Sequence, residues 1–152
     1  MNCSIAQCLE VVGEWWSLLI VRDCFFGVSR FEQFQERLGI ARNMLTQRLQ
    51  TLADHGIVER VAYQAHPVRY DYRLTAKGRD LWPVLETMRQ WGDRWEAPKG
   101  PPLQMVHRRC GHVATARLIC SACGADLELS AMVLQPGPGA GNPDRSEVTL
   151  PR

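Results

Sequence analysis

The stretch that decides the fold is VRYDYRLTAKG, at residues 68–78. Apolar and charged side chains alternate up to Leu74, which is the period of a strand with one buried face. The segment Ile57–Tyr63 also favours a strand, and Gln64–Pro67 between the two has the composition of a turn. The pattern therefore predicts a β-hairpin whose apolar side packs on a helical core, with Thr75 as the N-cap of the next helix.

Two short helices joined by a glycine turn are predicted before the hairpin. The sequence Ser29-Arg30-Phe31-Glu32 matches a capping box, in which the serine and glutamate side chains bind free amides of the first helical turn. A helix follows over roughly residues 30–37, then a turn at Leu38-Gly39-Ile40, then a second helix from about Arg42 to His55. Two such helices form a helix-turn-helix, and a hairpin directly after them makes it a winged helix.

The exposed face of the second helix is rich in side chains that can recognise DNA bases. Arginine can form two hydrogen bonds with guanine, and asparagine or glutamine can do so with adenine. Cations on the hairpin are placed to reach phosphates or a minor groove. We therefore predict DNA-binding residues at Ser29, Arg30, Arg42, Asn43, Thr46, Gln47, Gln50, His66 and Arg69. Ordinary solvent-facing helices are also polar, so this pattern alone leaves both interpretations open.

The distribution of charge favours a polyanionic partner, although the whole chain of 152 residues has a net charge of only +2. Residues 37–79 carry eight arginine and lysine residues against three acidic ones, whereas residues 1–36 carry two against five. A basic block of this kind is typical of nucleic-acid binding. Charges that happen to cluster on a solvated surface would look the same.

Helices are also predicted on both sides of the basic block. Residues 3–27 indicate one largely buried helix. A second helix over residues 76 to about 96 carries one apolar stripe of large side chains at spacings of three and four. This stripe needs a partner, either the first helix of the same chain or a second copy. Winged-helix proteins that bind palindromic DNA are commonly two-fold dimers, which favours a homodimer.

Composition indicates a globular intracellular protein, with 45% hydrophobic and 22% charged residues. The longest strongly apolar run, Leu18–Val21, is far shorter than a membrane span, and the N-terminus lacks the pattern of a signal peptide. We therefore expect a cytoplasmic protein with no membrane partner, made of one domain and a small appendage. In that compartment its six cysteines should be reduced thiols or metal ligands.

The C-terminal third has the ligand spacing of a zinc site. After a stiff linker over residues 97–103, a His-x2-Cys pair and a Cys-x2-Cys pair lie within residues 104–135. A module of this size has too little apolar area to fold alone, so a metal would serve as its core. We predict structural zinc held by His107, Cys110, Cys120 and Cys123, with His112 as the rival of His107. The alternative is a loose peptide with three reduced cysteines. A disordered tail over residues 136–152 is expected to follow.

Cys3, at the start of the first helix, is a candidate sensor thiol. Amide dipoles at a helix start favour a thiolate, which oxidants and electrophiles attack. The alternative is that Cys3 is a small hydrophobic residue, as we expect for Cys24.

Taken in order, these motifs resemble the HxlR-type winged-helix transcriptional regulators, relatives of the MarR group. The shared features cover about residues 3–95: the opening cysteine, W-x-LLI-x-RD, RFxxF, MLTQRLxxL, GIVER and YxLTxKG. The resemblance implies a bacterial, cytoplasmic, homodimeric DNA-binding regulator whose outer helices form the dimer. It also implies a sensing role for Cys3, because several members detect quinones, aldehydes or oxidants through this cysteine. Longer members carry a similar CGH…CxxCG segment. The chain departs from the family at Ala41, where a serine often caps the recognition helix.

The predicted fold is therefore mainly α with a small β-hairpin: a winged helix-turn-helix domain over residues 1–96 and a small C-terminal zinc-ribbon-like module. We expect a sequence-specific transcriptional regulator that binds double-stranded DNA, with an affinity modulated by thiol chemistry or a small-molecule effector. The alternative function is a protein-interaction adaptor that uses the zinc module. No Ser/His/Asp set, phosphate-binding glycine loop or carboxylate pair in a recognisable context points to an enzyme.

Overall fold

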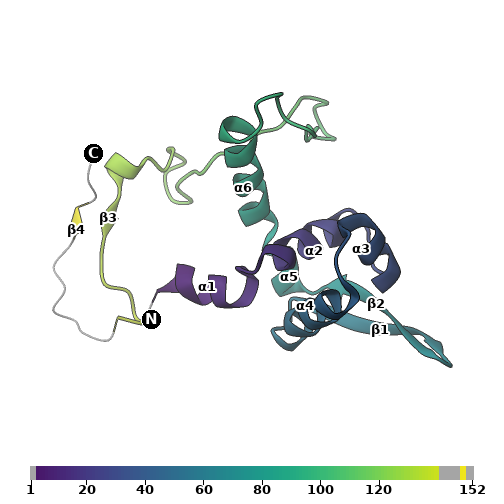
Figure 1. The fold of residues 1–152 in the computed structure, drawn as a ribbon. Coiled ribbons are helices and arrows are strands. Elements are labelled where there is room, and N and C mark those ends of the chain that lie inside the picture. Colours follow the sequence, from purple (N-terminus) through teal and green to yellow (C-terminus); the bar gives the residue numbers. More distant parts are fainter. Residues whose placement is uncertain (1–2, 141–147, 150–152) are drawn as a thin grey trace. The chain divides into compact units, whose positions relative to one another are not determined.

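The structure, a computed structural model, describes residues 3–140 and the backbone of residues 148–149. It divides into two compact units, of which the first covers Cys3–Arg89 and the second begins at Gln90. The helices are α1 (Ser4–Val12), α2 (Trp15–Phe25), α3 (Phe31–Leu38), α4 (Arg42–Asp54), α5 (Ala76–Arg79) and α6 (Trp82–Trp95), and the hairpin strands are β1 (Val58–Ala65) and β2 (Val68–Leu74). The prediction of a mainly helical chain with one small antiparallel hairpin is confirmed (Figure 1).

The N-terminal segment is two helices, so the prediction of one helix over residues 3–27 is wrong. α1 and α2 are bent by 78° relative to each other. The N–H of Gly13 still donates to the Leu9 carbonyl at 2.8 Å, but Glu14 is extended (ψ 135°) and starts α2. A Cβ at position 13 would lie 2.4 Å from the Leu9 carbonyl oxygen, so only glycine fits this close approach. The apolar spacing continues across the break, which is why periodicity did not reveal it.

The helix-turn-helix is formed by α3 and α4, close to the predicted boundaries. Gly39 adopts the left-handed conformation at φ 62°, which allows the tight turn between the two helices. The predicted Ser29–Glu32 capping box is wrong. The N-cap of α3 is Arg30, and its backbone N–H donates to Oε1 of Gln33 at 3.1 Å.

β1 and β2 pair as an antiparallel hairpin with only His66 and Pro67 between them. The register shifts between Ala62 and Gln64, which marks a β-bulge. The apolar side of β2 packs on the helices only near its base, through Tyr72 and Leu74. Nearer the tip, Val68 is 54% exposed and Tyr70 is 38% exposed. The prediction that the whole apolar side is buried is therefore wrong: the outer half of the hairpin projects beyond the helices (Figure 1).

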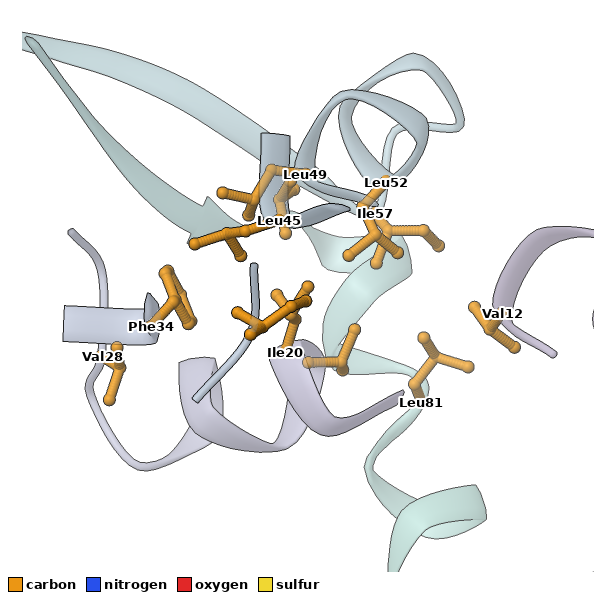
Figure 2. Close-up of a cluster of buried hydrophobic side chains, with 12 residues drawn as sticks. Val12, Ile20, Val28, Phe34, Leu45, Leu49, Leu52, Ile57 and Leu81 are labelled. Atoms are coloured by element: carbon orange, nitrogen blue, oxygen red, sulfur yellow. The ribbon is translucent and has the colours of Figure 1, made fainter. Parts of the chain in front are cut away.

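The hydrophobic core of the first unit lies where α1, α2, α3 and α4 meet the base of the hairpin. Figure 2 shows its side chains converging from these elements, with Ile20 near the centre and Phe34 toward one side. Both are fully buried, as are Leu45 and Leu52 of α4. Three buried leucines on one side of α4, at steps of three and four residues, leave its opposite side free for solvent or a ligand.

The helical segment after the hairpin begins as predicted but is broken. Thr75 is the N-cap of α5, and its hydroxyl accepts a hydrogen bond from the N–H of Gly78 at 3.1 Å. α5 ends at Arg79 and α6 starts at Trp82, so the prediction of one continuous helix over residues 76–96 is wrong. Pro83 gives the reason, because it has no N–H with which to continue the helical ladder to the Arg79 carbonyl.

The second unit contains little regular structure beyond the end of α6. A short 3-10 helix covers Leu129–Ala131, and β3 (Val133–Leu134) pairs with β4 (Val148–Thr149). The tail predicted as disordered over residues 136–152 falls mostly outside the described residues. Within residues 3–140 and 148–149 no single helix is long and apolar enough to span a membrane; only the bent pair α1 and α2 together passes that length and composition test.

Candidate DNA-binding site

The exposed side of α4 carries the five side chains predicted to contact DNA bases. Arg42, Asn43, Thr46, Gln47 and Gln50 all lie on this helix and are exposed. Local hydrogen bonds occupy two of them: Thr46 donates to the Arg42 carbonyl at 2.9 Å, and Asn43 Oδ1 accepts from the Met44 N–H at 2.9 Å. The Gln47 side chain makes no hydrogen bond within the described part of the chain, so its amide is free to bind another molecule.

Gln50 connects α4 to the hairpin. Its Oε1 accepts a hydrogen bond from Arg60 of β1 at 3.2 Å, and its Nε2 donates to Asp54 at 2.6 Å. The Arg60 guanidinium also lies 5.6 Å from the centre of the Tyr70 ring. Both ends of the Gln50 amide are therefore engaged in the free protein, so contact with a base would require Gln50 to give up these partners.

The start of α4 and the outer hairpin line a common groove of about 320 Å³. Phe31 and Glu32 come from α3, Arg42 comes from α4, and six residues come from the hairpin, including Arg69. The Arg42 guanidinium lies over the Phe31 ring, 4.9 Å from its centre. Such an exposed cation–π contact is worth about 0.5–1 kcal/mol, enough to orient the arginine without neutralising it. The helix and hairpin cations predicted separately therefore line a single groove.

Arg69 is the hairpin cation with the greatest freedom. Its side chain is exposed and makes no hydrogen bond or ion pair within residues 3–140, whereas Arg60 binds Gln50 and Arg73 binds Asp71. His66 is exposed in the turn at the tip of the hairpin.

Ser29 and Arg30 are turned toward the hairpin base, where Asp71 holds them. The Ser29 hydroxyl donates to Asp71 Oδ1 at 3.1 Å, and the Arg30 guanidinium lies 3.7 Å from the same oxygen. The backbone N–H of Tyr72 donates to the Ser29 carbonyl at 2.7 Å. Arg30 also lies over Tyr63, 4.7 Å from the ring centre. These contacts fix the hairpin relative to α3, so Ser29 positions the hairpin in the free protein.

Sequence reasoning missed Asp71 and the aromatic rings under the arginines. Asp71 is only 14% exposed in its side chain and binds three groups, Ser29, Arg30 and Arg73. In the sequence, its alternation with Tyr70 and Tyr72 indicates only a strand. An acidic residue within a basic hairpin was the available signal, because it needs nearby cations or hydroxyls once it is half-buried.

The N-cap of α4 is Ala41, which makes no side-chain hydrogen bond. Ala41, where the chain departs from the family pattern, therefore lies directly before Arg42 at the start of α4, as the sequence predicts. In place of the partner that a serine would supply, Asn43 Oδ1 accepts the hydrogen bond of the Met44 N–H in this first turn, at 2.9 Å.

Large apolar side chains remain exposed on α6 and α1, and Trp15 of α2 is also exposed. On α6 the exposed fractions are 41% for Val84, 51% for Met88, 60% for Trp91 and 61% for Trp95. On α1 they are 72% for Ile5 and 57% for Leu9. The inner residues of the predicted α6 stripe, Leu81 and Leu85, do pack on the core of the first unit.

The cysteines differ in environment. Cys3 is the N-cap of α1 and is half-buried, and Cys8 on the same helix is exposed. Burial, with a further contribution from the Asp23 carboxylate, raises the pKa of Cys24 to about 12. Cys24 therefore stays protonated at neutral pH and is unreactive, as predicted, whereas Cys3 and Cys8 are accessible.

Each predicted pair of zinc ligands lies on its own tight turn in the second unit. His107 Nδ1 is 3.3 Å from Cys110 Sγ. Hydrogen bonds from the backbone N–H groups of Cys123 and Ala122 lower the pKa of Cys120. Among the described residues, however, no three His, Cys, Asp or Glu side chains come together as a group that could hold a metal ion.

A helix-turn-helix joined to a β-hairpin, with arginines of both elements lining one groove, defines a winged-helix DNA-binding protein. A family model described as HxlR-like helix-turn-helix matches residues 11–100, and the chain belongs to this family of transcriptional regulators. The resemblance seen in the sequence is therefore confirmed, and membership implies DNA as the partner.

Relatives and solved structures agree with this family. The uncharacterised HTH-type transcriptional regulator Rv3095 of Mycobacterium tuberculosis is 45% identical over 137 residues, covering 90% of this chain and 87% of the relative. The crystal structure of PA1607, described as a candidate transcription factor, has a TM-score of 0.74 and 39% identity, covering 83% of this chain and 89% of that chain. The redox regulator HypR in its reduced form has a TM-score of 0.55 and 32% identity, covering 64% of this chain and 99% of that chain.

Proposed function

We propose that this regulator binds a specific double-stranded DNA sequence as a homodimer, with α4 in the major groove and the hairpin on the phosphate backbone. The observation that carries the proposal is the common groove lined by Arg42 of α4 and Arg69 of the hairpin. Two cations on different elements that face one space form a surface for a polyanion. The groove supports the choice of this side of the first unit as the one that faces DNA.

The residues divide into two roles. Gln47 is exposed on α4 with its side-chain amide unused, so it is suited to two hydrogen bonds with adenine. Arg69 is exposed and free of protein partners within the described residues, so it is suited to a phosphate, which is the same at every sequence. Arg42, oriented by Phe31, lines the groove together with Arg69 and can serve either role.

The experiment is selection of bound genomic fragments by the purified protein, followed by affinity measurements on the selected and on scrambled duplexes. We expect Q47A to reduce the ratio of specific to non-specific affinity, and R69A to weaken binding to both duplexes by a similar factor. A wild-type protein that enriches no fragment would contradict sequence-specific binding. Equal effects of Q47A and R69A on both duplexes would contradict the assigned roles.

The exposed apolar side chains of α6 support the homodimer. Val84, Met88, Trp91 and Trp95 recur at helical spacing, and each is at least 41% exposed. Covering such side chains is worth about 1.5–3 kcal/mol for each one fully buried. A second copy is the fitting partner, because the two half-sites of a palindrome require two equivalent reading helices.

Light scattering tests the dimer. M88E introduces a charge into the α6 stripe, and L103E introduces the same charge at an exposed leucine outside α6. We expect a dimer for the wild type and for L103E, and a monomer with weakened DNA binding for M88E. A monomeric wild type, or dimers unaffected by M88E, would remove this part of the proposal.

Thiol chemistry at Cys3 is the proposed regulatory input. Support comes from its position as the half-buried N-cap of α1, next to the exposed Ile5, and from the similarity to a redox regulator. Oxidation of the thiol by a peroxide adds polar oxygen at the start of a helix whose apolar face is exposed. We expect peroxide to change DNA affinity in the wild type and in C8S but not in C3S. An unchanged response in C3S would refute the role of Cys3.

A further inference from the structure

The two cysteine-containing turns of the second unit are structural copies of each other, offset by 13 residues. In the first, the N–H of His107 donates to the His112 carbonyl at 2.9 Å, and in the second the N–H of Cys120 donates to the Ala125 carbonyl at 2.7 Å. Gly111 donates to the His107 carbonyl at 2.8 Å, and Gly124 donates to the Cys120 carbonyl at 2.8 Å. The two turns therefore have the same hydrogen-bonded backbone.

The same correspondence holds at the base and at the glycine of each turn. The N–H of Ala114 donates to the Met105 carbonyl at 2.7 Å, and that of Leu127 donates to the Leu118 carbonyl at 2.9 Å. Isolated β-bridges close both turns at equivalent positions, Val106 with Val113 and Ile119 with Asp126. The glycines are left-handed in both, at φ 73° for Gly111 and 76° for Gly124. Two unrelated loops would not agree at each of these positions.

The repeat distinguishes between the two candidate histidines. His107 corresponds to Cys120, and Cys110 corresponds to Cys123, so each turn offers a ligand at the same two positions. His112 corresponds to Ala125, a position with no ligating side chain in the second copy. Spacing alone left the two histidines as rivals, whereas the matched backbone places His107 at a ligand position.

The geometry of the first turn already suits a metal. In a tetrahedral site with Zn–N of about 2.0–2.1 Å and Zn–S of about 2.3 Å, the nitrogen and the sulfur lie about 3.5–3.6 Å apart. His107 Nδ1 and Cys110 Sγ are separated by 3.3 Å. Among the described residues the four side chains do not come together as one group, so a bound ion would have to draw the two turns together.

Side-chain burial contributes little to the stability of the described part of the second unit. No described side chain from Gln90 to Ala140 is buried. Leu118 is 62% exposed and Ile119 is 55% exposed, although both flank the ordered second turn. An ion pair between Arg117 and Asp126 at 2.7 Å is exposed and contributes little. Small segments of this kind usually need a metal or a disulfide to fold.

We propose that His107, Cys110, Cys120 and Cys123 bind one structural zinc ion, and that His112 is not a ligand. Each turn supplies two of the four tetrahedral positions, and the ion joins the two copies into one module. With all four positions filled by protein side chains, no water is bound, so the site is structural. The proposal does not depend on DNA binding.

The test is the metal content of the full-length protein purified without a metal-binding tag and reconstituted with zinc under reducing conditions. We expect one zinc ion per chain by elemental analysis for the wild type, for C8S and for H112A. We expect C110S and C123S to fall to background, and H107A to lose most of its zinc. C8S is the matched control because Cys8 is an exposed cysteine outside the module.

Cobalt substitution keeps the test decisive if a variant misfolds. Cobalt bound to the wild type should show the thiolate charge-transfer band and the intense visible bands of tetrahedral coordination, and zinc should displace it. Proteolysis of the wild type should cut within residues 104–135 much faster after chelation than before. Absence of zinc and of the cobalt bands in the wild type would overturn the site. One ion per two chains, or loss in H112A with retention in H107A, would overturn this ligand assignment.

Discussion

Replacement of Arg69 by alanine should make DNA binding less dependent on salt concentration. It should leave the stability of the folded protein nearly unchanged. The Arg69 side chain is exposed and has no hydrogen-bonding or ionic partner within the described residues, so R69A should alter the free energy of unfolding by less than about 0.5 kcal/mol. Each phosphate contact contributes about 0.9 to the slope of log affinity against log salt. In a homodimer with one Arg69 contact per protomer, the slope should become shallower by about 1.8.

The assay is fluorescence anisotropy on the selected duplex at several salt concentrations between 50 and 200 mM. Over this fourfold range, a slope difference of about 1.8 means that the wild type loses about 12-fold more affinity than R69A. K99A is the control, because it removes one exposed cation from the linker outside the winged helix. Equal slopes for R69A and wild type would refute the phosphate contact. A shift of the same size in K99A would show that net charge, not position, governs binding.

Three further predictions concern the fold and its thiols. Since the pKa of Cys24 is raised to about 12, iodoacetamide at pH 8 should modify Cys8 but leave Cys24 intact in peptide maps. Alkylation of native Cys24 at pH 8 would contradict the raised pKa. The same shift should lower the free energy of unfolding as the pH rises above 9 toward 12, because the thiol then ionises in the unfolded chain before it does in the folded one. T75A removes the cap bond to Gly78 and should lower the free energy of unfolding by about 1–2 kcal/mol in urea titrations, whereas T75S should stay near wild type; equal losses in both would assign the effect to the methyl group. F34A opens a cavity in the fully buried core and should cost about 3–5 kcal/mol in the same titration, and a loss below 1 kcal/mol would contradict the described core.

The sequence predicted those parts of the fold that depend on local patterns. The α3 and α4 boundaries follow from apolar spacing and from Gly39, and the hairpin follows from strict alternation up to Leu74. The two helix breaks escaped prediction for different reasons. At Gly13 the apolar spacing is the same on both sides of the break, so only the extended backbone of Glu14 reveals it. Pro83 was visible in the sequence, but the rich apolar stripe around it favoured one continuous helix.

Parts of the candidate site depend on contacts between distant segments, and these could not be predicted. Ser29 is among the predicted DNA-binding residues, yet its hydroxyl binds Asp71, 42 residues further along the chain. The bond between Gln50 and Arg60 likewise requires α4 and β1 to lie side by side. The apolar stripe of α6 was predicted from spacing. Spacing does not say which residues of the stripe are covered, and the packing of Leu85 on the core is a tertiary contact.

The most direct test of the central claim is hydroxyl-radical footprinting of a selected operator, combined with the number of chains bound per duplex. If two copies each place α4 in a major groove and the hairpin on the adjoining backbone, two protected patches should appear about 10–10.5 base pairs apart, or a multiple of that distance, with two chains on each duplex. One protected patch with a single chain per duplex, or uniform protection without a defined footprint, would contradict it.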